Sequence, residues 1–149
     1  MSIVFTKMSG CGNDFIIIDN RQSVIKNSEK IDFVTKICVP KVSVGADGVI
    51  FIEKSDKTDF KWDFYNADGS SAEMCGNGAR CVAHYAFLRK IAEKKMSFET
   101  TAGIITAEIK ENSVRIRLTM PNSLQRNQRE NDCCNPKPQN TIKYYYKSF

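Results

Sequence analysis

Short apolar runs recur along the chain and predict β-strands. Residues 15–18 and 49–52 are continuous apolar runs rich in β-branched side chains, which is typical of buried strands. Residues 60–65 alternate large aromatic and more polar side chains, and we expect Phe60, Trp62 and Phe64 to pack in the core. Further strands are predicted at 4–8, 95–100, 104–110 and 114–120, the last with Val114, Ile116, Leu118 and Met120 turned inward.

Two segments have the spacing of apolar residues that helices show. The first begins at Ser28, its predicted N-cap, and ends at Pro40. Its predicted buried face consists of Ile31, Val34 and Cys38. The second covers roughly residues 78–90 and is apolar on nearly every side. A helix of that kind is buried, so we expect a central helix wrapped by the sheet.

The periodic pattern stops after Pro121. Residues 122–140 are rich in asparagine, glutamine and charge, which predicts a loop or disorder. Residues 144–146, three tyrosines, fit either an added edge strand or simply a sticky end. We therefore divide the chain into a domain at 1–121 and an atypical polar tail at 122–149, and the abrupt change suggests a truncated or frameshifted product.

Composition and charge narrow the class of protein. The chain has 149 residues, 42% of them apolar, in runs too short to span a membrane, so we expect one ordinary domain. The first residues lack the basic region and the long apolar run of a signal peptide, which predicts a cytoplasmic protein with reduced cysteines. A net charge of +5 with no clustered basic footprint predicts no nucleic-acid partner and no membrane partner.

The segment at 66–81 carries the strongest chemical signal. Cys75 stands immediately before Gly76, Asn77 and Gly78, which open the central helix. Amides at a helix N-terminus are unsatisfied donors that favour a neighbouring thiolate and can hold a carboxylate. From these residues alone, a buried structural cysteine beside a tight turn fits equally well. The single histidine, His84, and the six cysteines form no Cys-x-x-Cys pair, so no metal site is predicted, and we expect His84 to be structural.

Four short strings give the chain a family resemblance. It resembles diaminopimelate epimerase at Gly12–Phe15, Gly45–Gly48, Tyr65–Ser70 and Met74–Cys81, in that order. The resemblance covers roughly residues 3–120, the family's N-terminal half. It implies an α+β fold of two similar halves, each a sheet wrapped on a central helix, with the site between them. It also implies a cofactor-free isomerase that interconverts LL- and meso-diaminopimelate in lysine biosynthesis.

By that resemblance, each candidate site residue has a role. Cys75 matches the family's first catalytic cysteine. Asn13 and Asn66 match substrate-binding asparagines, and Gly76 and Asn77 match the pair whose amides hold the substrate. The expected partner is therefore the small-molecule substrate diaminopimelate, and no metal or cofactor is implied.

The chain also departs from the family. Inversion without a cofactor needs a base on one face of the α-carbon and an acid on the other, and the family's second cysteine comes from a Cys-Gly-Thr-Gly type string that this sequence lacks. Cys81 follows Cys75 by six residues, so on one helix their side chains would point about 240° apart. Cys133–Cys134 lacks the glycines. At Gly48, where some members carry a substrate-contacting glutamine, no side-chain role is assigned.

Two functions therefore stay open. The first is diaminopimelate epimerisation, with little activity from this chain alone unless a homodimer completes the site. The alternative is an inactive truncated half-epimerase, a folded fragment or weak anion-binding module. A half-protein would also leave bare an apolar surface, which predicts self-association.

Overall fold

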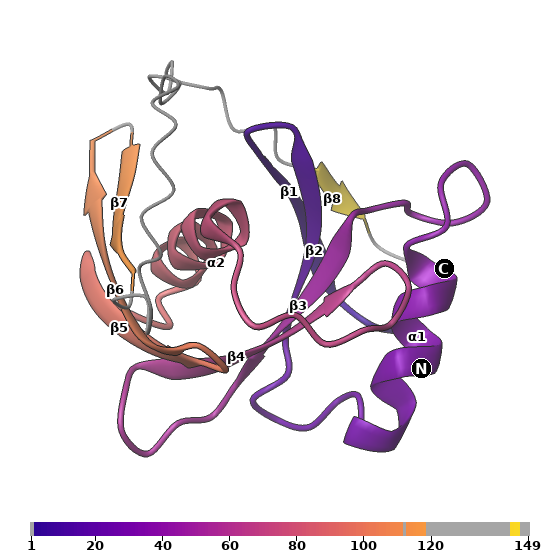
Figure 1. Cartoon of the computed structure of the whole chain (residues 1–149), viewed down its shortest axis with the longest axis horizontal. Helices are drawn as coiled ribbons and strands as arrows, with labels where there is room; N and C mark the ends of the chain where they lie inside the picture. Colours follow the sequence, from indigo (N-terminus) through magenta and orange to yellow (C-terminus); the bar gives the residue numbers. More distant parts are fainter. Residues whose placement is uncertain (1, 112, 119–143, 147–149) are drawn as a thin grey trace, which may run out of the picture.

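The computed structural model describes residues 2–111, 113–118 and 144–146. Its elements are β1 (Phe5–Gly10), β2 (Asn13–Asp19), α1 (Asn27–Ile37), β3 (Gly48–Glu53), β4 (Phe60–Asn66), α2 (Gly76–Leu88), β5 (Lys95–Thr100), β6 (Gly103–Lys110), β7 (Ser113–Arg117) and β8 (Tyr144–Tyr146). The strands form one eight-stranded sheet in the order β7-β6-β5-β4-β3-β2-β1-β8. The sheet curls around α2, and α1 lies on its other face (Figure 1). The predicted α+β fold with a central helix is confirmed.

The sheet is mixed because each helix links two parallel strands. β2 pairs with β3 in parallel, and the chain between them contains α1. β4 pairs with β5 in parallel, and the chain between them contains α2. The other paired strands are antiparallel neighbours.

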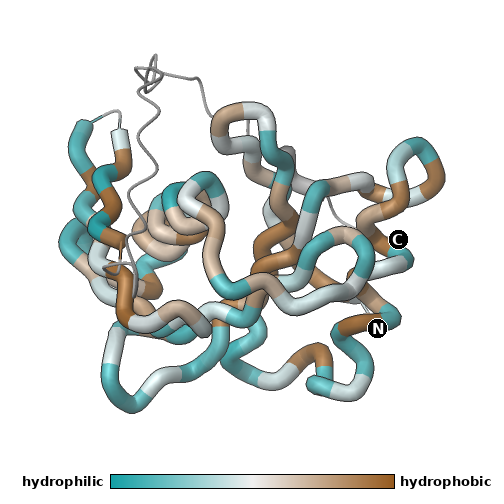
Figure 2. The backbone as a smooth tube through the Cα atoms, viewed as in Figure 1, coloured by the Kyte–Doolittle hydropathy of each residue, from teal (hydrophilic) through white to brown (hydrophobic). Residues whose placement is uncertain are grey.

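The central strands are buried on both faces. In β2, Phe15 and Ile17 belong to the inner core around α2, whereas Ile16 and Ile18 belong to the outer core under α1. The residues of β3 divide between the two cores in the same alternating way. This explains why both runs are continuously apolar in the sequence. In Figure 2 these strands are brown, whereas the loop that joins β3 to β4 is mainly teal.

The aromatic residues of β4 face the inner core, as the alternation predicts. Phe60, Trp62 and Phe64 are each at most 5% exposed. The Phe60 ring stacks on Phe98 of β5 with ring centroids 4.9 Å apart. The opposite face of β4 carries Asp63, which helps to hold α1.

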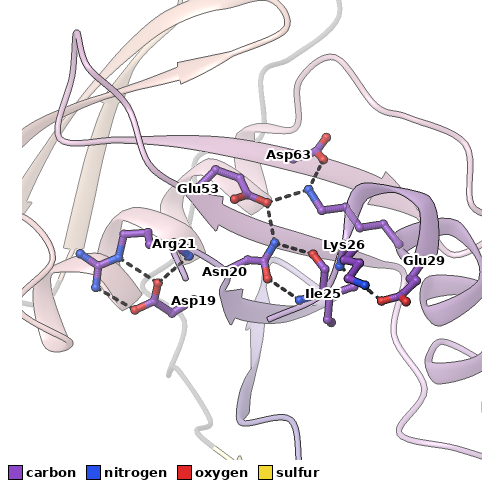
Figure 3. Close-up of polar contacts among 9 residues, drawn as sticks. Asp19, Asn20, Arg21, Ile25, Lys26, Glu29, Glu53 and Asp63 are labelled. Carbon is purple, nitrogen blue, oxygen red and sulfur yellow. Dashed lines mark hydrogen bonds and ion pairs between the residues drawn. The ribbon is translucent and has the colours of Figure 1, made fainter. Parts of the chain in front are cut away.

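A buried lysine fixes α1 to the outer face of the sheet. Lys30 is 1% exposed, and its Nζ lies 2.6 Å from Glu53 Oε1 and 2.8 Å from Asp63 Oδ2. Glu53 Oε1 also accepts a 2.7 Å hydrogen bond from Asn20 Nδ2 (Figure 3). Burial lowers the pKa of the Lys30 ammonium, but the hydrogen bonds and charges of the two carboxylates outweigh burial and raise that pKa above its ordinary value.

The predictions for the first helix were wrong in two details. Lys26, not Ser28, is the N-cap, because the Glu29 carboxylate reaches back to accept a hydrogen bond from the Lys26 amide at 3.4 Å. Ile31 is 56% exposed rather than buried. Its side chain lies against the turn after β4, where a Cβ on Gly69 would be 2.9 Å from Ile31 Cγ2.

Three other details of the structure differ from the sequence predictions or decide between them. α2 begins at Gly76, two residues earlier than expected. Leu118 is 52% exposed, not inward, because β7 ends at Arg117, the last residue of its register with β6. Residues 144–146 do form an edge strand, antiparallel to β1. Met120 and the predicted loop at 122–140 lie outside the described residues.

Membrane-spanning helices and metal-binding clusters are both absent from the described part of the chain. No helix there is long and apolar enough to cross a membrane. No group of three or more histidine, cysteine or acidic side chains there is arranged to hold a metal ion.

Candidate active site

The candidate site lies at the N-terminus of α2. Cys75 is the N-cap residue in an extended conformation, with φ −143° and ψ 118°. The amide of Ala79 makes a 2.8 Å hydrogen bond to the Cys75 carbonyl, so the amides of residues 76–78 precede the intrahelical ladder. In the described structure no side chain caps this helix, and its first turn holds no acidic residue. The helix start therefore offers free donors and partial positive charge to an anion.

Two glycines shape this helix start in different ways. A Cβ on Gly78 would lie 3.2 Å from Ile50 Cδ1 and 3.6 Å from the Phe15 ring, so glycine lets the helix lie close to β2 and β3. At Gly76 the nearest atoms to such a Cβ would be Arg80 Nη1 at 3.8 Å and Ile116 Cδ1 at 3.9 Å. The Gly76 backbone is therefore the more open of the two.

Asn13 and Asn77 meet across the inside of the sheet. Asn13 is the first residue of β2, directly after Cys11 and Gly12, whose φ values of 53° and 86° make the tight turn from β1. Asn77 Nδ2 donates a 2.6 Å hydrogen bond to Asn13 Oδ1. The structure thus brings two of the predicted substrate-binding residues together beside Cys75.

Asn66 lies at the same edge of the sheet as Asn13, the edge where β2 and β3 begin and β4 ends, but on a different strand. The strand register aligns Phe15 with Gly48 and Gly48 with Asn66, which places Asn66 two strands, about 10 Å, from β2. The exposed Asn66 side chain donates a 3.0 Å hydrogen bond to Ser70 Oγ within its own turn. A Cβ on the intervening Gly48 would lie 2.6 Å from the Phe64 ring, so the strands leave no room there for a side chain.

Two polar residues that position the site were missed in the sequence. Asp47 Oδ2 accepts a 2.8 Å hydrogen bond from the Asp14 amide, and the Asp47 carbonyl accepts one from the Ala67 amide at 3.0 Å. Asp47 thereby ties the start of β2 to the turn after β4. Arg80 Nη2 donates to Asn77 Oδ1 and, at 3.3 Å, to Cys11 Sγ. Both residues lie inside the four strings that carry the family resemblance, and that position was the available signal for their role.

The other cysteines differ sharply from Cys75 in their environment. Cys81 is 5% exposed in the inner core, where burial raises the pKa of its thiol to about 12. Cys38 is 2% exposed in the outer core, and burial, together with the charge of Asp47, raises its pKa to about 11. Cys75 is half-buried, and Cys11 is exposed. The structure therefore gives Cys81 no access to a substrate at the start of α2.

His84 and the outer face of the sheet lie apart from the site. Half-buried His84 follows Cys75 by nine residues, roughly 13 Å along the helix. A shallow depression of about 460 Å³ lies on β5–β7, and its lining includes Lys95, Arg115 and Arg117 but none of the predicted site residues.

Solved structures share this fold at low sequence identity. The PhzF-family phenazine biosynthesis protein of Bacillus anthracis matches with a TM-score of 0.62 and 20% identity over 78% of this chain and 40% of its own. A probable proline racemase from Agrobacterium radiobacter, solved with bound carbonate, matches with a TM-score of 0.59 and 13% identity over 76% of this chain and 41% of its own. The fold is the one that PhzF and proline-racemase-like proteins share.

Sequence similarity narrows that class further. The family model for diaminopimelate epimerase matches residues 5–123. The diaminopimelate epimerase of Hydrogenobaculum sp. is 52% identical over 134 residues, 84% of this chain and 48% of its own. That of Aquifex aeolicus is 49% identical over 127 residues, 78% of this chain and 46% of its own. The chain belongs to the diaminopimelate epimerase family of isomerases, and it spans about half the length of the curated relatives it matches.

Proposed function

We propose that this chain provides one half of a diaminopimelate epimerase site, in which Cys75 moves the α-proton on one face of the substrate. The observation that carries the proposal is the position of Cys75, beside Asn13 and Asn77. Cys75 is the N-cap residue of a helix whose first amides receive no hydrogen bond from a capping side chain. The proposal includes a role in lysine biosynthesis, to which the name of the relatives points, and a cytoplasmic location.

The first step is binding of the substrate's α-carboxylate. The amides of Gly76 and Asn77 donate to it, and the Asn13 side chain supplies a further donor. The free helix start and the absence of acidic residues from its first turn support this step. Asn66, at the same sheet edge, holds a more distant part of the substrate.

The second step is proton transfer. The Cys75 thiolate takes the α-proton and becomes a thiol, and the electron pair of the broken C–H bond delocalises into the carboxylate. A thiol on the opposite face then gives its proton to the α-carbon and becomes a thiolate, which inverts the centre. The reaction as proposed needs no cofactor, because two thiols in opposite protonation states serve as base and acid.

The facing thiol comes from another structural unit. Cys38 and Cys81 are poor candidates because both are buried and their thiols have pKa values of about 11 and 12. Loss of a positioned acid costs on the order of 10²–10⁴-fold in rate. We therefore expect the chain alone to exchange the α-proton slowly.

Deuterium exchange at the α-carbon of diaminopimelate tests the proposal. We expect the chain to exchange at well under about 1 s⁻¹, the low end of ordinary enzymes. Cys75→Ala should abolish this exchange, and Cys38→Ala, in the outer core, should leave it unchanged. Equal exchange by the chain and Cys75→Ala would favour the inactive half-epimerase instead. Turnover near 1 s⁻¹ that Cys75→Ala abolishes would mean that a complete site forms, most simply across a homodimer.

Self-association is the related proposal. Exposed large apolar side chains of the described residues include Val4, Val42, Ile104 and Leu118, at 68%, 84%, 52% and 52% exposure. Sedimentation over a range of concentrations tests it, and a monomer at the highest concentration would contradict it.

A further inference from the structure

A directed chain of hydrogen bonds links α2 to the start of β2. Arg80 lies three residues after Asn77, about one turn along the helix. Arg80 Nη2 donates to Asn77 Oδ1, and Asn77 Nδ2 donates to Asn13 Oδ1 at 2.6 Å. The same guanidinium nitrogen contacts Cys11 Sγ at 3.3 Å, within the β1–β2 turn. Arg80 thus contacts one asparagine directly and reaches the other only through it.

The direction of this chain follows from the chemistry of its first member. A guanidinium can only donate hydrogen bonds, so the Asn77 atom that faces it must be the amide oxygen. The other end of the Asn77 amide is then an NH₂ group, which also can only donate. Asn13 must therefore turn its oxygen toward Asn77. Its own NH₂ group is left as a donor for something else.

We infer that Arg80 is a positioning residue that fixes the amide orientation of Asn13, so that Asn13 presents a donor to the substrate carboxylate. The inference rests on the proposed function for its ligand. Without Arg80, Asn77 can reverse, Asn13 can reverse with it, and Asn13 would then present an oxygen to the carboxylate. The bond that prevents this is charge-assisted, which makes it stronger than a bond between neutral amides.

A purely structural role for Arg80 makes different predictions. If Arg80 only tied the β1–β2 turn to α2, its loss would loosen the turn without reversing any amide. The polarity of the chain, in contrast, depends on whether residue 80 can only donate. Lysine shares that property with arginine, whereas methionine does not.

The side-chain NH₂ signals of Asn13 and Asn77 in the ¹⁵N-labelled, ligand-free chain report the polarity directly. In the unmodified chain we expect the Asn77 NH₂ to exchange with water about tenfold more slowly than the Asn13 NH₂. Arg80→Lys should keep this difference, and Arg80→Met should abolish it. Thermal melting checks that each variant is folded.

A second variant reverses the chain while keeping Arg80. In Asn77→Asp, both terminal atoms accept, so Asn13 must turn its NH₂ group toward the carboxylate. Slow exchange should then appear at Asn13. This variant is nearly isosteric, so it keeps the inference testable even if Arg80→Met fails to fold.

The ligand is examined in a separate titration with meso-diaminopimelate. Arg80→Met should weaken binding about tenfold or more, and Arg80→Lys by less than about threefold. Unchanged protection of Asn77 in Arg80→Met, its full loss in Arg80→Lys, or an unprotected Asn13 in Asn77→Asp would each overturn the inference. If the ligand-free signals behave as expected but the unmodified chain does not bind meso-diaminopimelate, the proposed function fails and the orientation by Arg80 stands.

Discussion

Alkylation should divide the cysteines of the described residues into a reactive group and a slowly reacting group. Iodoacetamide reacts with the thiolate, so the rate depends on how much of each thiol is ionised. Burial raises the pKa of Cys38 to about 11 and that of Cys81 to about 12. At pH 8 their thiolate fractions are about 0.001 and about 0.0001, against roughly a quarter for an ordinary thiol with a pKa near 8.5. We therefore expect both to react at least about 200-fold more slowly than an ordinary thiol.

Cys75 is the cysteine to follow in this experiment. It is half-buried at the start of α2, whereas Cys11 is exposed and would consume reagent first if its exposure dominated. The labelling is therefore run at limiting iodoacetamide on both the unmodified chain and Cys11→Ser, with each site located by peptide mass mapping. Labelling in 6 M guanidinium serves as the control, because unfolding removes the differences in burial. Modification of Cys38 or Cys81 before Cys75 in the folded protein would refute the reasoning.

Two substitutions test the packing of the fold, one on the outer face of the sheet under α1 and one between β3 and β4. Lys30→Met should lower the free energy of unfolding by about 2–4 kcal/mol in urea titrations, somewhat less than for a fully buried pair, because Glu53 and Asp63 stay partly exposed. Folding raises the pKa of Lys30 above its ordinary value of 10.5, so the lysine is charged in both states between pH 6 and pH 9 and the loss of stability should be constant there. The loss should shrink only as the pH rises above 10.5, through the pKa of the folded state. A loss that vanished near pH 7 would contradict the assignment. Gly48→Ala should cost about 1–3 kcal/mol, because its Cβ would lie 2.6 Å from a ring carbon and from a backbone oxygen of β4. Gly76→Ala, whose Cβ meets nothing closer than 3.8 Å, is the matched control for stability and should be neutral or slightly stabilising, and equal losses in the two variants would refute this explanation.

The elements that could be predicted from the sequence are those fixed by local periodicity. The runs in β2 and β3 are apolar because both of their faces are covered, and that pattern is visible without knowledge of what covers them. The face of α1 was less predictable. Ile31 and Lys30 are neighbours in the sequence, and only the position of Glu53 and Asp63 on the sheet decides that the lysine is the buried one.

The same distinction applies to the site. A cysteine followed by glycines at the start of an apolar helix is a local pattern, so the place of Cys75 was predictable. The hydrogen bond between Asn77 and Asn13 joins residues 64 positions apart, and the hydrogen bond from Arg80 to Cys11 spans 69 positions. Contacts of that kind depend on how β1 and β2 lie against α2, and no local spacing encodes them.

The topology explains why motifs so far apart in the sequence meet. β4 and β5 are parallel, so α2 must start at the edge of the sheet where β4 ends and carry the chain back to the opposite edge. β2 and β3 are also parallel, and β3 is antiparallel to β4, so β2 and β3 both begin at that same edge. The β1–β2 turn, the loop that holds Asp47 and the start of α2 therefore converge there by necessity. In the described residues no side chain caps the amides at the start of α2, so they are open to an anion. The proposed chemistry requires a second surface to close over that anion, exclude water and supply the facing acid.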